Sequence, residues 1–368
     1  MSKVNNTPKV INFGAGPAKL PEEVLKDVQK ELLSLENAKV SILELSHRSN
    51  DFKKIIEDAQ ASVRSLLNVP DNYKILFMQG GGTGLFAAVP LNLMYKTGSA
   101  DYIVTGSWSA KAAKEAAKYG KVNMVLAKQS KYTEIPDPST WNLDKNASYV
   151  YYCSNETVHG IEFNYVPETN GIPLVADMSS NIFTKPLDIS KFGVIFAGAQ
   201  KNFGPSGITL VIVRDDLLGH AMPVCPTMFD FAVMDKDNSI HNTPPTFQIY
   251  VIGKIFHWLK KNGGVEGMEK LAIKKSEKIY RVIEESKGFY TCPVQKNVRS
   301  RMNIPFRIRD DEELENKFLA GAAKRGMLQL KGHRSVGGIR ASLYNAVTEE
   351  ETEELASYMT SFFQENSK

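Results

Sequence analysis

The sequence has little cysteine and no long apolar run. Its 368 residues include three cysteines, Cys153, Cys225 and Cys292, which lie far apart without a CxxC pair or metal-ligand spacing. This pattern argues against a disulfide framework or a zinc site and is typical of free thiols in a reducing compartment. No apolar stretch approaches the roughly eighteen residues of a membrane span, and the first residues lack a signal-peptide core. We therefore expect a cytoplasmic protein with no membrane partner and no bound metal.

An excess of charge of one sign is also missing. Lysine and arginine number 45 against 41 aspartates and glutamates, and no run of five basic residues occurs. We expect no nucleic-acid partner, because such proteins concentrate basic residues in patches or stripes. Nucleotide motifs are absent as well. Leu85 stands where a dinucleotide fingerprint counted from Gly80 needs its third glycine, no GxxxxGK loop exists, and the GAGPAK stretch at 14–19 fails both tests. A nucleotide-dependent dehydrogenase is therefore disfavoured.

What the sequence does contain is a regular alternation of strands and helices. Apolar runs bounded by turn residues predict strands at 74–78, 101–105, 122–127, 149–153, 173–176, 194–198 and 208–213. Amphipathic helices are predicted after Pro21 and from Asn50, which we expect to cap the second of them. Further helices lie between the strands. The alternation predicts an α/β fold with a mostly parallel central sheet, covered on both faces, with ligands at the carboxyl ends of its strands.

The pattern changes after about residue 248. Two long helical stretches are followed by a strand at 302–308, a helix at 311–325, two short strands and a final helix. Thr348 and Glu351 form a capping box for that last helix. We expect a large domain over 15–260 and a smaller C-terminal α/β domain over 261–368, with the N-terminal segment 1–14 packed against the small domain.

Four chemically distinctive features follow predicted strands. The glycine turn at 80–84 opens a helix, whose free N–H groups can hold a phosphate, and Trp108 offers a flat ring. Asp177 ends a buried strand, and Lys201 stands where another buried strand meets a Gly/Pro-rich loop, where desolvation lowers the pKa of an amine. Each feature alone also suits an ordinary structural role. Together they fit pyridoxal 5′-phosphate, which needs a lysine for its aldehyde and an acid for its ring nitrogen.

Longer motifs carry a family resemblance over essentially the whole chain. They are NFGAGPAKLP, LSHRSNDF, QGGGTGLFAAVPLNL, ETVHG, VADMSSN, GAQKNFGPSG, NTPPTF and KGHRSVGGIRASLYNAV. In these motifs the sequence resembles the phosphoserine aminotransferases, a family of class V aminotransferases. The resemblance implies an aspartate-aminotransferase-like (fold type I) homodimer that uses pyridoxal phosphate. It further implies amino-group exchange between O-phospho-L-serine and 2-oxoglutarate, giving 3-phosphohydroxypyruvate and L-glutamate, in serine biosynthesis.

The resemblance also assigns roles to the cofactor residues. It implies that Lys201 joins the cofactor covalently and shuttles a proton, that Asp177 pairs with the pyridine nitrogen, and that Trp108 stacks on the ring. The other implied contacts are with the phosphate (Gly82, Thr83, Gln200), the ring hydroxyl (Thr157) and the phosphate of the neighbouring subunit's cofactor (Asn242, Thr243). Each site would then be completed across a dimer interface, and a monomer should be inactive.

Arginines and histidines define the expected substrate side. The planar fork of arginine suits carboxylates and phosphates. The resemblance implies that Arg340 receives the α-carboxylate, and that the pairs His47-Arg48 and His333-Arg334 receive the distal anion. That anion is a phosphate in one substrate and the γ-carboxylate of glutamate in the other. Taken singly, each pair also suits a solvated surface.

Other interpretations stay open on the sequence. A different class V enzyme, such as a serine–glyoxylate aminotransferase, would share the cofactor residues, and transamination of 4-phosphohydroxythreonine is a compatible side activity. A cysteine desulfurase needs a cysteine on a mobile loop, for which Cys225 is the one candidate worth naming. A cofactor-binding regulator without catalysis is disfavoured, because Lys201, Asp177 and Arg340 are all present.

Overall fold

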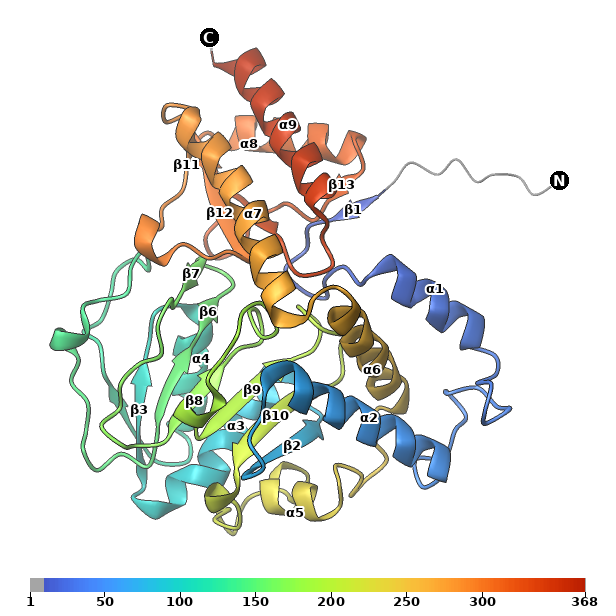
Figure 1. Cartoon of the computed structure of the whole chain (residues 1–368). Coiled ribbons are helices and arrows are strands. Elements are labelled where there is room, and N and C mark those ends of the chain that lie inside the picture. The colour runs from blue at the N-terminus through green and yellow to red at the C-terminus, as the bar shows by residue number, and fades with distance from the viewer. Residues whose placement is uncertain (1–9, 368) are drawn as a thin grey trace.

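A seven-stranded sheet forms the centre of the computed structural model, which describes residues 10–367 (Figure 1). Its strand order is β2-β10-β9-β8-β5-β3-β4. Only β10 in this sheet runs antiparallel to its neighbours, so the predicted mostly parallel sheet is confirmed. The strands are β2 (Tyr73–Met78), β3 (Ser99–Ile103), β4 (Lys121–Met124), β5 (Val150–Cys153), β8 (Leu174–Asp177), β9 (Val194–Gly198) and β10 (Thr209–Arg214).

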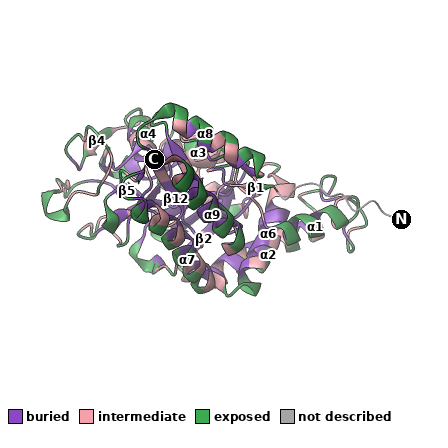
Figure 2. Cartoon of the chain, turned by 90° about the horizontal axis from the view of Figure 1, so that it is seen from above, coloured by how far each residue is buried: buried purple, intermediate pink, exposed green. Residues whose placement is uncertain are grey.

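Helices cover both faces of this sheet because alternate residues of its strands are apolar on opposite sides. Ile195 belongs to the core on one face, under α2 and α6, whereas Phe196 belongs to the core under α3, α4 and α5. Figure 2 shows buried residues between these layers and exposed residues on the outer helix turns. The helices are α1 (Glu22–Glu31), α2 (Asn50–Leu67), α3 (Gly81–Leu93), α4 (Ser107–Ala116), α5 (Phe231–Lys236) and α6 (Thr246–Lys261).

The C-terminal elements enclose a third apolar core, above the large sheet in Figure 1. It is built from an antiparallel sheet and three helices: β11 (Tyr290–Thr291), β12 (Asn303–Ile308), β14 (Ile339–Ser342), α7 (Gly264–Glu285), α8 (Glu312–Lys324) and α9 (Glu349–Asn366). Strand β1 (Ile11–Asn12) pairs in parallel with β13 (Met327–Leu328), and Ile11 and Phe13 are buried in this core. The rest of the predicted N-terminal segment, residues 1–9, lies outside the described residues.

Some local predictions differ from the structure. The cap of α2 is Ser49, not Asn50: the Ser49 side chain accepts a hydrogen bond from the Phe52 N–H over 3.2 Å. The strand expected at 122–127 ends at Met124, because Val125 and Leu126 continue as a buried loop and an apolar run reports burial rather than strand geometry. The capping box of α9 is confirmed. Within residues 10–367, no helix combines the length and apolarity needed to cross a membrane.

Candidate active site

The carboxyl ends of the central strands bring the distinctive residues together. Asp177 ends β8, Lys201 follows β9, and the first turns of α3 and α4 follow β2 and β3. After β5 the chain forms a short hairpin of β6 (Asn155–Glu156) and β7 (Ile161–Glu162), which reaches toward the C-terminal elements in Figure 1. Parallel strands place these ends along one edge, which is where open α/β sheets bind ligands.

Lys201 lies at the centre of this edge. Its Nζ donates a hydrogen bond to Thr157 Oγ1 over 2.8 Å. Burial lowers the pKa of the Lys201 ammonium, while Asp177, Cys153 and Glu156 act in the opposite direction. The lowered pKa increases the fraction of neutral amine, which is the nucleophilic form.

Asp177 is a buried carboxylate with a partly satisfied hydrogen-bond capacity. Its Oδ1 accepts from the Ser179 N–H over 2.9 Å and from the Ser179 hydroxyl over 2.6 Å. Burial raises its pKa, and Lys201 and Ser179 oppose that rise. Among the described residues none donates a hydrogen bond to Oδ2. The carboxylate therefore suits a cationic N–H of a bound ring.

The start of α3 forms a compact cup beside Asp177. Gly80 precedes the helix with φ 97°, a conformation that favours glycine, and the N–H groups of the first turn have no intrahelical acceptors. A Cβ added to Gly198 would lie 3.6 Å from the Gly82 nitrogen, and one added to Gly82 would lie 3.7 Å from Ser179 Oγ. Gly82 and Thr83 thus stand at a helix N-terminus next to the Asp177 turn, a place that favours an anion.

Trp108 closes the other side of this space. Its ring centroid lies 5.0 Å from Lys201 Nζ and 4.3 Å from Lys111 Nζ, with the ring of Phe86 at 6.4 Å. Its Nε1 is buried and has no hydrogen-bond partner in the described part of the chain. A phosphate cup, a stacking ring, a buried acid and an amine fit pyridoxal phosphate, group for group.

A cluster of positive groups lies next to Trp108. Arg340, on β14, donates from Nη1 to the Thr157 carbonyl over 3.4 Å. Burial lowers the pKa of His333, and Arg340, Lys111 and Arg334 lower it further. Burial and the nearby His333 lower the pKa of His159 to about 4. Arg340, Lys111 and Arg334 around His333 form a region of positive potential, which attracts anionic substrates.

The family is decided by comparison with known proteins. The model of the class V aminotransferases matches residues 10–355. The chain belongs to this family.

Among its relatives, the phosphoserine aminotransferase of Drosophila melanogaster is 63% identical over 361 residues, covering 97% of this chain and 99% of the relative. One similar solved structure is a phosphoserine aminotransferase with a radiation-damaged Schiff base. It has a TM-score of 0.95 at 44% identity, and the match covers 98% of this chain and 100% of that chain. A structure of the PLP-bound enzyme from Trichomonas vaginalis has a TM-score of 0.92 at 39% identity, covering 95% and 99%. The predicted aminotransferase fold and PLP-dependent transaminase class are confirmed.

Some residues assigned by the family resemblance lie apart from the Lys201 cluster in the single chain. His47 is half-buried and Arg48 exposed, both in the loop between α1 and α2. Within residues 10–367 no hydrogen bond or ion pair joins either of them to Lys201, Trp108 or Arg340. Their role as anion ligands stays a prediction, as it does for His333 and Arg334, which lie near the cluster.

The predicted phosphate contacts outside α3 are also placed by the structure. The half-buried Gln200 directly precedes Lys201, and its carbonyl accepts from the Ala18 N–H over 2.8 Å. The Thr243 carbonyl accepts from Gln79 Nε2 over 3.4 Å, and Asn242 Oδ1 is buried with no hydrogen-bond partner in the described part of the chain. The predicted reach of Asn242 and Thr243 to a neighbouring subunit stays a prediction, because it concerns a second copy.

Sequence reasoning from the residues missed the segment at 14–19. This segment matches no nucleotide-binding motif and reads as an irregular loop, yet it packs against Lys201. Gly16 has φ 138°, and a Cβ there would lie 3.3 Å from Lys201 Cγ. The Ala15 carbonyl accepts from the Tyr344 hydroxyl over 3.0 Å. A glycine followed by proline before any predicted element was the available signal, since it marks a backbone held in a special conformation.

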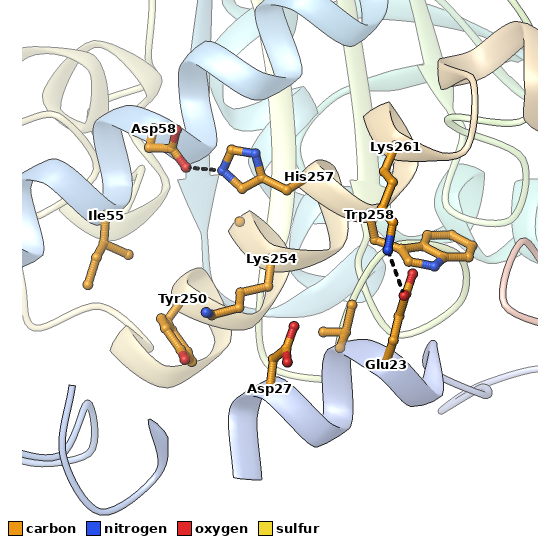
Figure 3. Close-up of a pocket in the computed structure, with 11 residues that line it drawn as sticks. Glu23, Asp27, Ile55, Asp58, Tyr250, Lys254, His257, Trp258 and Lys261 are labelled. Atoms are coloured by element: carbon orange, nitrogen blue, oxygen red, sulfur yellow. Dashed lines mark hydrogen bonds and ion pairs between the residues drawn. The ribbon is translucent and has the colours of Figure 1, made fainter. Parts of the chain in front are cut away.

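A second hollow lies away from this edge, between α1, α2 and α6 (Figure 3). It measures about 400 Å³. Its charged side chains pair with one another: His257 Nε2 lies 2.7 Å from Asp58 Oδ2, and Lys261 Nζ lies 3.0 Å from Glu23 Oε2. These pairs fasten α1 and α2 to α6, so we assign this hollow a structural role.

Proposed function

We propose that this class V aminotransferase exchanges amino groups between O-phospho-L-serine and 2-oxoglutarate, using pyridoxal phosphate. The observation that carries the proposal is the half-buried Lys201, whose amine lies 2.8 Å from Thr157 Oγ1 and beside Asp177 and Trp108. The names of the relatives support phosphoserine as the substrate.

The cofactor would be held by groups from five strand ends. The first turn of α3 would receive its phosphate, together with Gln200, while Trp108 would cover one face of the ring. Asp177 would accept from the ring nitrogen through Oδ2 and Thr157 would contact the ring hydroxyl. When bound, pyridoxal phosphate supplies an aldehyde and an electron sink for negative charge at the substrate α-carbon.

Lys201 would both anchor the cofactor and move the proton. Because burial lowers the pKa of Lys201, its amine can take a proton from the substrate α-carbon. It would then deliver this proton to the cofactor carbon C4′. Asp177 stays ionised opposite a cation, which keeps the ring nitrogen protonated.

Arg340 and the neighbouring cations would orient the substrate. Arg340 is half-buried beside Thr157, so its guanidinium can hold an α-carboxylate close to Lys201. His333 and Arg334 would receive the distal phosphate or carboxylate, because the positive potential around them suits either anion.

We also propose a cytoplasmic homodimer with shared sites. Four apolar side chains in α1 and the loop after it are exposed in the single chain: Leu25 (46%), Leu33 (87%), Val40 (40%) and Leu43 (62%). An exposed apolar surface of this kind marks an interface. The same loop carries His47 and Arg48, so a second copy docked here would deliver this pair, and Asn242 and Thr243, to its neighbour's site. The three free cysteines support a reducing compartment.

The proposal is tested by comparing amino donors. Purified enzyme loaded with pyridoxal phosphate is assayed with 2-oxoglutarate and either O-phospho-L-serine or L-serine. We expect kcat/KM for L-serine to be lower by on the order of 10³-fold, because two or three charge-assisted hydrogen bonds are lost. Arg334→Ala should lower kcat/KM for phosphoserine and glutamate and leave kcat/KM for L-alanine unchanged. Equal efficiencies for phosphoserine and serine would contradict the proposal.

A further inference from the structure

Glu156 is a fully buried carboxylate directly behind the cofactor site. It lies in β6, one residue before Thr157, and is 0% exposed. Its Oε2 accepts a hydrogen bond from the Trp108 N–H over 3.0 Å. Its Oε1 accepts from the Ser109 N–H over 2.8 Å and from the Ser109 hydroxyl over 2.5 Å. All three donors belong to the first turn of α4, which carries the stacking ring.

This carboxylate caps the N-terminus of α4, because the residue that precedes the helix cannot do so. The residue before the helix is Gly106, which has no side chain with which to accept the free N–H groups of the first turn. A negative charge at this position also complements the positive end of the helix dipole. The position of Trp108 is therefore fixed by a residue almost fifty positions away in the sequence.

Position 106 needs glycine because the Glu156 carboxylate approaches its backbone closely. A Cβ at position 106 would lie well inside contact distance of the Glu156 carboxyl carbon and Oε2. Gly106 has an extended backbone, φ 179°, so the need for glycine comes from this close approach and not from backbone strain. Two segments, 106–109 and 155–157, thus fit each other through one carboxylate.

Glu156 also acts on the charge balance at Lys201. Burial raises the pKa of Glu156, and its hydrogen bonds from Ser109 and Trp108 oppose that rise by favouring the carboxylate. As an anion, Glu156 joins Asp177 in raising the pKa of Lys201 against the effect of burial. A neutral side chain here would remove one of the two buried carboxylates that raise the pKa of Lys201.

We propose that Glu156 is a positioning residue that sets the orientation of Trp108 for stacking on the cofactor. The inference rests on the proposed use of pyridoxal phosphate, but its first consequence concerns the protein without cofactor. If Glu156 fixes the helix start, then the indole of Trp108 is already held in place before the cofactor arrives, and this preorganisation contributes to cofactor affinity.

The main test compares Glu156→Gln with Glu162→Gln. Glutamine keeps the volume of Glu156 but removes its charge and turns one oxygen into a donor that faces the donors of α4. Glu162 is the matched control: it is a buried carboxylate on the same hairpin, 4% exposed, and it pairs with Arg301 over 2.8 Å and not with α4. Ser109→Ala is a milder second variant, because it removes only the hydroxyl donor.

Three measurements are made on each variant. The first is the emission of Trp108 in the cofactor-free protein, isolated by subtracting the spectrum of the same variant carrying Trp108→Phe. The second is pyridoxal phosphate affinity from quenching of that emission. The third is the visible circular dichroism of the loaded protein per bound cofactor, with thermal unfolding followed in parallel.

We expect Glu156→Gln to shift the Trp108 emission, to weaken cofactor binding on the order of tenfold, and to alter the visible circular dichroism. Ser109→Ala should do the same to a smaller extent. Glu162→Gln should lower the unfolding temperature and leave the emission, affinity and circular dichroism unchanged. Unchanged emission and affinity in a folded Glu156→Gln protein would overturn the inference, as would equal changes in Glu162→Gln. Failure of the wild-type protein to bind pyridoxal phosphate would instead contradict the proposed function, while the Trp108 emission would still test the role of Glu156.

Discussion

Individual side chains at the site are controlled by burial and by the charges around them. Asp177 is buried and Lys201 half-buried, and each partly offsets the desolvation cost of the other's charge. His159 differs because no opposite charge offsets the effect of its burial: burial lowers its pKa and the nearby His333 lowers it further. It accepts or donates a hydrogen bond at Ser107 Oγ over 3.0 Å, and its ring packs edge-on against Tyr132.

Asp177→Asn should retain the cofactor but lose most of the turnover rate. Asparagine fills the same space and can still accept from Ser179, but it cannot hold a proton on the ring nitrogen by charge. Steady-state kcat together with the cofactor content of the purified variant checks this. A kcat close to that of the wild type would mean that another group protonates the ring.

His159 makes stability dependent on pH on the acid side. Its folded-state pKa is lowered from 6.5 to about 4, so the unfolded chain binds more protons between these values. The free energy of unfolding should therefore fall as the pH drops from about 6.5 towards 4. Thermal unfolding at pH 7 and pH 4.5 measures the fall, which should be smaller in His159→Gln. A fall of the same size in His159→Gln as in the wild type would contradict this assignment.

At the scale of elements, the sequence predicts site residues that directly follow a buried strand, but not those that act through tertiary contacts. The β9 strand was placed at 194–198, where the structure has it, because a buried strand bounded by glycine leaves a clear apolar run. Lys201, Asp177 and the 80–84 turn can be predicted as site residues because they follow such runs. Glu156 and Gly16 were missed because their roles come from tertiary contacts to α4 and Lys201, which no local pattern encodes. The pair His47-Arg48 is of a third kind, since the single chain does not bring it to Lys201 and we propose that a second copy does.

The capping box of α9 gives a prediction at this scale. The Thr348 side chain accepts from the Glu351 N–H over 3.2 Å, and Glu351 in turn pairs with Lys19 over 2.6 Å. Thr348→Ala should lower the free energy of unfolding by about 1 kcal/mol, the usual cost of losing such a cap. Denaturant unfolding measures the change. Thr360→Ala, at an exposed position on the same helix, serves as control, and an equal loss in both variants would contradict the capping argument.

For the whole molecule, the central question is whether two copies of the chain complete each other's sites, as we propose. The apolar surface on α1 and the following loop lies next to His47 and Arg48, so assembly and substrate recognition would depend on the same segment. Leu33 is the most exposed large apolar residue of this surface, at 87%.

Leu33→Asp should weaken the dimer and reduce activity together. A charge placed in an apolar interface pays a desolvation cost without a partner. Sedimentation velocity over a range of concentrations measures association, and activity is assayed at the same concentrations. Val224→Asp, a change at an apolar residue 73% exposed elsewhere on the chain, is the matched control. An unchanged sedimentation profile for Leu33→Asp would place the interface elsewhere.

The attachment of the cofactor to Lys201 is tested most directly by chemical trapping. The loaded protein is reduced with borohydride, digested, and mapped by mass spectrometry. We predict that the phosphopyridoxyl mass is found on the peptide containing Lys201, and that Lys201→Ala protein carries no such label. A label on a different lysine of the wild-type protein, or no label after reduction of a fully loaded sample, would contradict the account.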